Sequence, residues 1–365
     1  MRKTILYLID SLERGGAEVL LVSALREVHQ EFNIVLVTLH DKSAFGPEEL
    51  CYDAMFCLNM QSKLRILSCV RQLKKIIHEY NVDIVQSALY WSVITARLAC
   101  NKRTKHIFRL DNVMTSAQYN YKWYSGYTKL LETLTYTKNQ VIIAPTEEVL
   151  TDFNRSVGIK GRSKVIYNFI KDEFFENQIE YVVPSTGLKL VAVGNLKHQK
   201  NYSLLIEAFK LLQHNDISID IYGEGSDREM LQRQIVRFNL PIRLMGMEEN
   251  IYKILPYYDG FVMCSTFEGF GISAAEAMAM GLPLLLSDIP VLREISHNNA
   301  IFFDPYSAQS FSDAVLQIMN GKINLKQLSD CGKKIAGENY TKEKYLNQLL
   351  NYYEEILNPS KNLIT

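Results

Sequence analysis

Two patterns of apolar residues alternate along most of this chain. Short, almost continuous apolar runs predict buried β-strands, and longer segments with apolar residues every three or four positions predict amphipathic helices. In the first half, helical segments at 17–29 and 64–80 are interspersed with strand runs at 4–9, 34–39, 84–86, 107–110 and 141–144. Short buried strands separated by helices are typical of a parallel sheet with both faces covered.

A second series of the same kind begins near residue 188, with strand runs at 188–193, 217–222, 242–244, 260–264 and 284–287. Residues 171–187 lie between the two series. This segment is polar, ends in Pro184-Ser185-Thr186-Gly187 and is typical of a linker. We therefore predict an α/β protein with two doubly wound, Rossmann-like domains, residues 1–170 and 188–342, that face each other across a cleft. A length of 365 residues also favours two domains.

Composition excludes several classes of protein. The 40 basic and 40 acidic residues balance, so bulk charge gives no reason to expect a nucleic-acid partner. No apolar stretch reaches the length of about 18 residues that a membrane span needs, and the first apolar run ends at Asp10, too early for a secretion signal. The six cysteines form no Cys-x-x-Cys pair. We expect a cytoplasmic protein.

The segment Ser265–Pro283 has the most specific chemistry. Its glycine-containing loop, residues 269–271, can bring bare backbone N–H groups close to a ligand, and a short helix then begins near Ser273. Helix N-termini bind anions, most often phosphate. Glu268 and Glu276 flank this position and can accept hydrogen bonds from hydroxyl groups. The pattern predicts a phosphate ligand with hydroxyl-rich groups on both sides, and an ordinary strand–turn–helix unit with surface acids is the alternative.

The same segment resembles the E-x7-E signature of glycosyltransferase family 4, a large family of retaining enzymes with the GT-B fold. Other segments resemble this family in the same order along the chain: Gly15-Gly16-Ala17-Glu18, Ile166-Tyr167-Asn168, Val193-Gly194-Asn195-Leu196 with Lys200-Asn201, Tyr222-Gly223-Glu224-Gly225 and Leu244-Met245-Gly246. The resemblance covers nearly the whole chain and is strongest over residues 187–305. It implies that a final helix, residues 343–365, crosses back to the first domain.

The resemblance also implies transfer of a hexose-type sugar from a UDP- or GDP-sugar. Glu268 would hold the hydroxyl groups of the donor sugar, Glu276 would hold the ribose, and Lys200 would stabilise charge on the diphosphate. The positions that the resemblance places at the donor are Gly15, Gly16, Gly194, Asn195, Gly246, Met247, Gly269, Phe270, Gly271, Ile272 and Glu276. The alternative for Gly15-Gly16 and for Gly246-Met247 is an ordinary turn with no role in donor binding.

The chain departs from the family pattern at two of its loops. Asn195 stands where most members have an arginine, and a neutral amide cannot make a bidentate charged contact with phosphate; Lys197 is a candidate replacement. Asp111 stands near the place of a frequent histidine and could position an acceptor hydroxyl or stabilise positive charge on the sugar, with a helix cap as the alternative. No Asp-x-Asp motif is present, so we expect no essential metal and no cofactor.

Two stretches of the first domain, Lys63–His78 and Tyr119–Lys138, combine basic residues with aliphatic or aromatic ones. They could lie on an anionic membrane surface, although core packing with a solvated outer face explains them as well. With a membrane contact, the acceptor would be a lipid-linked glycan of bacterial capsule, O-antigen or exopolysaccharide synthesis. Two other functions stay open: a nucleotide-sugar epimerase of GT-B fold and a non-catalytic relative that binds glycan.

Overall fold

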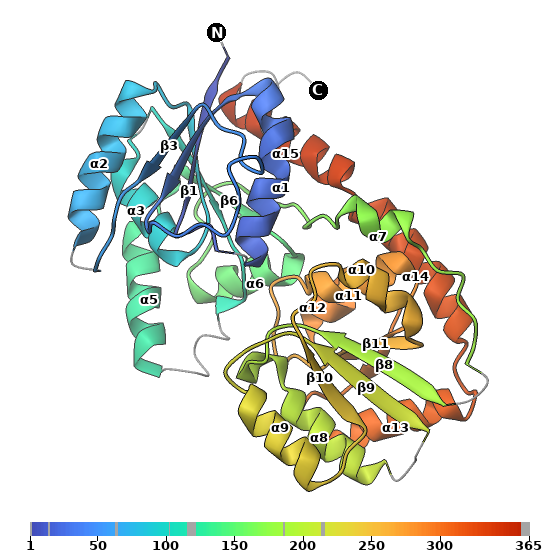
Figure 1. Cartoon of the computed structure of the whole chain (residues 1–365). Helices are drawn as coiled ribbons and strands as arrows, with labels where there is room; N and C mark the ends of the chain where they lie inside the picture. Colours follow the sequence, from blue (N-terminus) through green and yellow to red (C-terminus); the bar gives the residue numbers. More distant parts are fainter. Residues whose placement is uncertain are drawn as a thin grey trace. The chain divides into compact units, whose positions relative to one another are not determined.

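The computed structural model describes residues 2–13, 15–62, 65–101, 103–114, 122–184, 187–212 and 216–358. The chain divides into two compact units (Figure 1). Unit 1 comprises Met1–Asn168 and Glu343–Thr365, and unit 2 comprises Phe169–Lys342.

Within the described residues, unit 1 is built on a seven-stranded parallel sheet in the order β3-β2-β1-β4-β5-β6-β7. Its strands are β1 (Thr4–Ile9), β2 (Asn33–Thr38), β3 (Ala54–Cys57), β4 (Ile84–Ser87), β5 (Lys105–Arg109), β6 (Gln140–Ala144) and β7 (Ser163–Val165). The interior strands β1, β4 and β6 are buried along their whole length, because helices cover both faces of the sheet.

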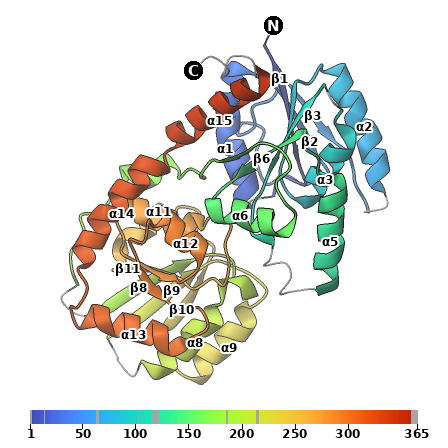
Figure 2. The ribbon, with the colours of Figure 1, turned by 180° about the vertical axis from the view of Figure 1, so that it is seen from behind.

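The helices of unit 1 form a layer on each face of the sheet (Figures 1 and 2). On one face lie α2 (Ile66–Glu79), α3 (Tyr90–Ala99), α5 (Lys122–Thr135) and α6 (Glu147–Ser156), and on the other lie α1 (Gly16–Glu31) and α15 (Lys342–Leu357). The hydroxyl of Tyr353 on α15 lies 2.8 Å from the Tyr7 hydroxyl and donates to Gln86 Oε1 at 2.5 Å. The C-terminal helix is therefore built into the core of unit 1.

In the part of unit 2 that the structure describes, a six-stranded parallel sheet has the order β10-β9-β8-β11-β12-β13. The strands are β8 (Leu188–Val193), β9 (Ile217–Tyr222), β10 (Ile242–Gly246), β11 (Gly260–Met263), β12 (Leu284–Ser287) and β13 (Ile301–Phe303). From β8 the chain first adds β9 and β10 on one side, and then crosses to the other side of β8 to add β11, β12 and β13. The switch point of the sheet therefore lies between β8 and β11. In sheets of this kind, ligands bind beyond the carboxyl ends of the strands at such a switch point.

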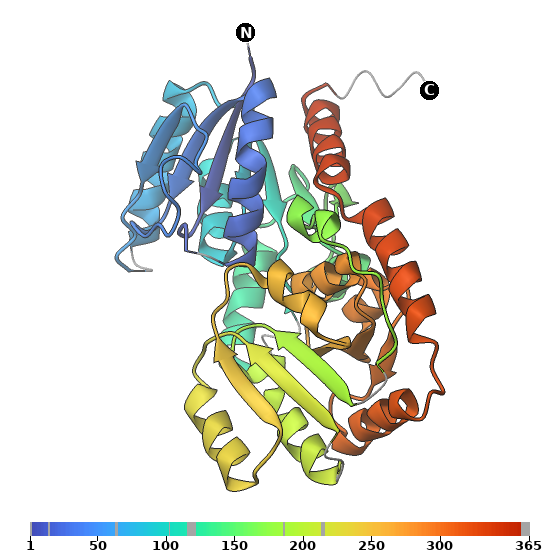
Figure 3. The ribbon, with the colours of Figure 1, turned by 45° about the vertical axis from the view of Figure 1, so that its right-hand side comes forward.

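Two helical layers also enclose the sheet of unit 2 (Figure 3). One contains α8 (Tyr202–Leu211), α9 (Arg228–Arg237) and α13 (Ala308–Met319), whose apolar residues share a core with β8, β9 and β10. The other contains α7 (Asp172–Glu176), α10 (Ile251–Ile254), α11 (Ile272–Met280), α12 (Pro290–Ile295) and α14 (Leu325–Asn339).

The strands predicted from apolar runs are all present, whereas β3, β7 and β13 have no counterpart in the prediction. These three strands lie at sheet edges, and most of their residues are only partly buried. An edge strand needs no continuous apolar run, so its sequence signal is weak.

The segment 171–187, which we expected to be a linker, belongs to unit 2. It contains α7, where Phe174 is buried, and Tyr181 lies in the core of unit 2. The Tyr181 hydroxyl donates to the Asp259 carbonyl at 2.9 Å. The buried side chains of Phe174 and Tyr181 therefore hold this otherwise polar segment on unit 2.

Of the two basic stretches, Lys63–His78 is helical from Ile66 as α2, and Tyr119–Lys138 contains α5. Lys63, Leu64 and residues 119–121 lie outside the described residues. Among the helices that the structure describes, none combines the length and the apolar character that a membrane crossing requires.

Candidate functional site

Two loops at the switch point of unit 2 are bonded to each other. The β8–α8 loop follows β8, and the β11–α11 loop follows its neighbour β11. Gln199 Nε2 donates to the Phe267 carbonyl at 2.8 Å, and the Thr266 N–H donates to the Gln199 carbonyl at 3.0 Å. These bonds hold the two loops that contain Lys200 and Glu268 in one place.

Lys200 and Glu268 form a direct ion pair. Lys200 Nζ lies 2.6 Å from Glu268 Oε1, and the two side chains are only 19% and 10% exposed. Lys200 ends a short 3₁₀ helix, His198–Lys200, and its carbonyl accepts a hydrogen bond from the Cys264 thiol at 3.0 Å. Because little water screens this pair, its electrostatic interaction is stronger than that of an exposed pair.

Helix α11 begins directly after the loop that contains Glu268. Its N-cap, Gly271, has a φ of +85°, and a Cβ there would lie 2.8 Å from Leu292 Cδ2, so only glycine fits. The Phe270 side chain is buried and packs edge-on against Tyr340 at 5.4 Å between ring centroids. The loop 269–271 and Ile272, the first residue of the helix, therefore place the positive end of the helix dipole beside Glu268.

Glu276 lies within α11, and although part of the residue is exposed, protein surrounds its carboxyl group. Burial raises the pKa of its carboxyl group from 4.5 to about 8, and the positive charge of Lys171 opposes this shift. A ligand that donates hydrogen bonds to this carboxylate would stabilise its ionised form, which burial disfavours.

The other predicted donor positions of unit 2 lie at neighbouring strand ends. The Gly194 N–H donates to the Tyr222 carbonyl at 2.9 Å, and the Gly246 carbonyl accepts from the Gly223 N–H at 2.7 Å. Met247, which follows β10, is 71% exposed. Asn195 and Lys197 are both exposed in the β8–α8 loop. The structure thus brings these positions to the same edge of the unit 2 sheet.

Unit 1 contains a separate group of predicted residues, and Asp111 is the best defined of them. Its Oδ2 accepts the Leu89 N–H at 3.0 Å, and its Oδ1 lies 3.5 Å from Arg109 Nε. Leu89 has a φ of +68°, which is rare for a leucine and costs about 1–3 kcal/mol. Burial raises the pKa of Asp111, the Arg109 charge opposes the shift, and Asp10 adds to it. The strained backbone at Leu89 thus positions the N–H group that holds the Asp111 carboxylate in place.

The Gly15-Gly16 turn begins α1 at the same edge of the unit 1 sheet. A Cβ on Gly15 would lie 2.4 Å from Glu18 Oε2, so the glutamate occupies the space that the glycine leaves open. A Cβ on Gly16 would meet nothing within 4 Å, so packing does not require a glycine there. Burial raises the pKa of Glu18, and the charges of Asp111 and Asp10 add to the shift.

Sequence reasoning missed Asp10, although it directly follows the buried strand β1 as Asp111 follows the β5 strand. Asp10 Oδ1 accepts the Ser92 N–H at 2.9 Å and the Ser92 hydroxyl at 2.6 Å. Burial raises the pKa of Asp10, and the bonds from Ser92 oppose the shift. A carboxylate at the end of a buried strand was the signal that could have identified it.

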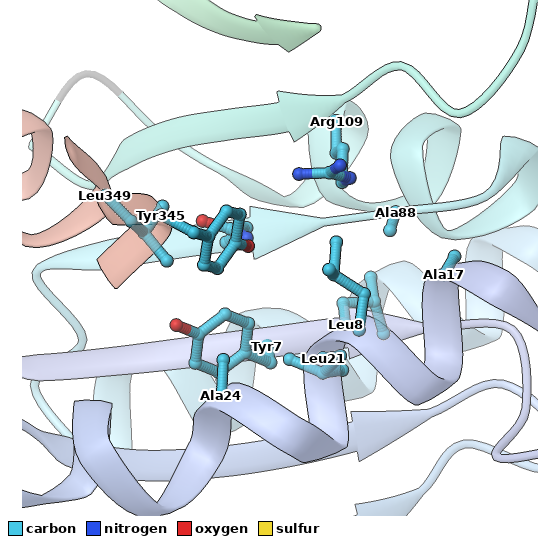
Figure 4. A pocket seen from close by; sticks show the side chains of 11 residues that line it. Tyr7, Leu8, Ala17, Leu21, Ala24, Ala88, Arg109, Tyr345 and Leu349 are labelled. Atoms are coloured by element: carbon cyan, nitrogen blue, oxygen red, sulfur yellow. The ribbon is translucent and has the colours of Figure 1, made fainter. Parts of the chain in front are cut away.

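A small cavity lies inside unit 1, between α1, α15 and the sheet (Figure 4). Its volume is about 20 Å³, enough for one water molecule and far too small for a sugar. Its polar lining comes from Tyr7, Gln86, Arg109 and Tyr345. Arg109 Nη1 is buried and has no hydrogen-bond partner among the described residues. The cavity is suited to a structural water rather than to a substrate.

Comparison with known families identifies the class to which this site belongs. Residues 14–174 match the family model described as Glycosyltransferase Family 4, and residues 173–335 match the one described as Glycosyl transferases group 1. Together the two models span most of the chain. The chain thus combines the domains of both glycosyltransferase models and is a glycosyltransferase.

Individual relatives cover most of the chain at low identity. The N-acetylgalactosamine-N,N'-diacetylbacillosaminyl-diphospho-undecaprenol 4-alpha-N-acetylgalactosaminyltransferase of Campylobacter jejuni is 25% identical, over 77% of this chain and 79% of its own length. The O-antigen biosynthesis glycosyltransferase WclY of Escherichia coli is 22% identical, over 96% of this chain and 98% of its own. The solved structure of HepE from Anabaena in complex with UDP matches with a TM-score of 0.79 at 17% identity, over 97% and 100% of the two chains. The predicted GT-B fold is confirmed.

Proposed function

We propose that this glycosyltransferase moves a hexose-type sugar from a UDP- or GDP-sugar to a hydroxyl group of a glycan acceptor, with retention at the anomeric carbon. The observation on which the proposal rests is the 2.6 Å contact between Lys200 and Glu268 at the start of α11. It unites a cation for the diphosphate, a carboxylate for sugar hydroxyls and a helix N-terminus in one small region.

During transfer, the bond between the anomeric carbon and the phosphate oxygen stretches, and negative charge gathers on the departing diphosphate. Lys200 Nζ and the first turn of α11 would stabilise that charge where it develops, which lowers the barrier more than it strengthens ground-state binding. Glu268 would accept hydrogen bonds from the donor sugar and keep Lys200 in position. Glu276 would accept hydrogen bonds from the ribose.

The proposed enzyme needs no metal ion for this step. Lys200 and the α11 dipole instead offer positive charge at the proposed diphosphate position. Turnover in the presence of EDTA tests this part of the proposal directly.

We propose Asp111 as the residue of unit 1 that positions the acceptor hydroxyl or stabilises positive charge on the sugar. Its carboxylate is held by the Leu89 N–H and by Arg109, so its orientation is set before a substrate arrives. The name of the Campylobacter jejuni relative contains a diphospho-undecaprenol acceptor, and that of the Escherichia coli relative refers to O-antigen biosynthesis. The first name supports a lipid-linked glycan acceptor, and the second supports a role in bacterial surface polysaccharide synthesis.

A lipid-linked acceptor would require unit 1 to approach a membrane surface. Leu67 at the start of α2 is 63% exposed, and Leu130 and Leu134 on α5 are 56% and 70% exposed. Exposed basic residues accompany them on the same helices: Arg71, Lys74, Lys75 and Lys129. Basic residues beside exposed leucines favour contact with anionic lipid. Flotation with liposomes that contain or lack anionic lipid tests this contact.

The decisive experiment is a panel of nucleotide-sugars, with release of nucleoside diphosphate as the readout and undecaprenyl-diphosphate-linked glycans as acceptors. A transferase releases the diphosphate in an acceptor-dependent manner. An epimerase would change the donor sugar without an acceptor, and a non-catalytic relative would bind without turnover. Release from no donor, together with no thermal stabilisation by any nucleoside diphosphate, would refute the proposal.

A further inference from the structure

The ion pair with Glu268 holds only the charged end of the Lys200 side chain. In the proposed transfer, Lys200 Nζ also has to contact the diphosphate, so Glu268 shares the ammonium group with the substrate. The position of this group then depends on what holds the rest of the residue. Two further contacts of Lys200, both within the protein, restrict it.

The first contact is made by Cys264, which directly follows β11 and holds the backbone of Lys200. Lys200 is the last residue of the 3₁₀ helix His198–Lys200, and a carbonyl at the end of a helix has no partner within that helix. The Cys264 thiol donates a hydrogen bond to this carbonyl, with 3.0 Å between sulfur and oxygen. Cys264 is only 1% exposed, so water does not compete for this bond.

The Cys264 thiol stays protonated at neutral pH. Burial raises its pKa from 9.0 to about 12, while a backbone hydrogen bond and the charge of Lys200 oppose the shift. A thiolate would lack the proton that the Lys200 carbonyl accepts, so the raised pKa preserves the hydrogen bond. The same protonation makes the thiol a poor nucleophile, which favours a role in holding the backbone.

The second contact confines the aliphatic part of the Lys200 side chain. A Cβ on Gly194 would lie 3.0 Å from Lys200 Cε and 3.1 Å from the Tyr202 hydroxyl, so the lysine side chain lies directly over this glycine. The Tyr202 hydroxyl donates to the Gly194 carbonyl at 3.2 Å and keeps the glycine in place. With its carbonyl held by Cys264 and its side chain against Gly194, Lys200 can move its ammonium group over a short range only.

We propose that Cys264 is a positioning residue of the transfer reaction, which acts through the Lys200 backbone to aim the lysine ammonium at the departing diphosphate. This inference rests on the proposed function, in which Lys200 stabilises the charge of the leaving group. A cation that is held in advance does not have to reorganise as this charge develops. Displacement of the cation therefore raises the barrier more than it weakens binding in the ground state, so loss of the Cys264 donor should reduce kcat more than it raises the KM for the donor.

The test compares Cys264→Ala with Cys264→Ser in the full chain, with steady-state release of nucleoside diphosphate as the readout. Serine differs from alanine by one hydroxyl group, which can donate to the Lys200 carbonyl. Cys264→Ala should lower kcat about 5- to 10-fold and change the donor KM by less than about 2-fold, whereas Cys264→Ser should keep kcat within about 2-fold of the wild type. Circular dichroism establishes that the variants are folded. If Cys264→Ala is not, Cys264→Val replaces it, because valine fills the site without a donor.

A second background separates positioning from a general loss of structure. The Lys200→Ala enzyme has no ammonium group to aim, so Cys264→Ala should change its remaining kcat, measured at high enzyme concentration, by less than about 2-fold. Cys69→Ala is the matched control. Cys69 is also 1% exposed, its thiol faces the Leu58 carbonyl at 3.8 Å in unit 1, and its loss should leave kcat unchanged.

Three results would each overturn the inference: a wild-type kcat for Cys264→Ala, an equal loss of activity in Cys264→Ser and Cys264→Ala, or an equal effect of Cys264→Ala with and without Lys200. In each case the proposed function stands, because the wild type still depends on Lys200 for transfer. If the wild type releases no nucleoside diphosphate from any donor, or Lys200→Ala matches the wild type, the proposed function itself fails and the role of Cys264 fails with it.

Discussion

Donor binding should depend on pH through Glu276. The carboxyl group has a pKa of about 8 in the protein without ligand, because burial disfavours its charged form. Ribose hydroxyls donate hydrogen bonds, so the ionised carboxylate is the form that binds them best. At pH 6 only about 1% of the protein has this form, and at pH 9 about 90% does. The donor affinity should therefore increase by up to about 100-fold over this range.

Glu276→Gln removes the titration while it keeps the size of the side chain. Binding of UDP by the variant should be almost independent of pH between 7 and 9, where the diphosphate itself no longer changes its charge. The ratio of wild-type to variant affinity, measured by titration calorimetry at several pH values, isolates the contribution of Glu276. A ratio that stays constant from pH 7 to pH 9 would refute the assignment of Glu276 to the ribose or its raised pKa.

The same group makes stability depend on pH with a definite sign. The folded protein keeps the Glu276 proton up to a pH of about 8, whereas the unfolded chain releases it near its ordinary pKa of 4.5. The contribution of Glu276 to stability therefore falls as the pH rises from about 4.5 to 8, by an upper limit of about 5 kcal/mol. Because Glu276→Gln lacks this loss, its Tm relative to the wild type should be higher at pH 9 than at pH 5. An equal difference in Tm at the two pH values contradicts the raised pKa.

Three further predictions test the site and its scaffold. Glu268→Gln should lower kcat about 100-fold with a smaller effect on donor affinity, and Lys200→Ala should weaken both; steady-state kinetics that match the wild type for either variant would contradict their roles. Excess EDTA should leave kcat/KM unchanged within about 2-fold, and a large loss that Mg²⁺ or Mn²⁺ restores would show a metal requirement. Gly271→Ala should lower the free energy of unfolding by about 1–3 kcal/mol, because its Cβ would meet Leu292 and its φ is +85°. Gly16→Ala is the control: open space surrounds the new methyl group, so the free energy of unfolding should change by less than about 1 kcal/mol. Urea denaturation measures both values.

The sequence was sufficient to predict the interior of both sheets. Strands such as β1 and β12 are buried on both faces, so their continuous apolar runs are visible without a structure. The α11 boundaries were also predictable, because Gly271 and Gly281 adopt the left-handed backbone conformation at its two ends. The edge strands β3, β7 and β13 were not, because a strand that is only partly buried needs no continuous apolar run.

The chemistry of the candidate site was only partly visible in the sequence. The glycine loop and Glu268 stand in one short segment, and resemblance to a family gave each residue an expected role. The tertiary structure alone placed Lys200, 68 residues away, against Glu268, and set Asp111 against the Leu89 N–H. It also decided the pKa of Glu276, which depends on the surrounding protein rather than on neighbours in the chain. Local patterns record the burial that each short segment needs, whereas ion pairs and raised pKa values arise between groups that only folding brings together.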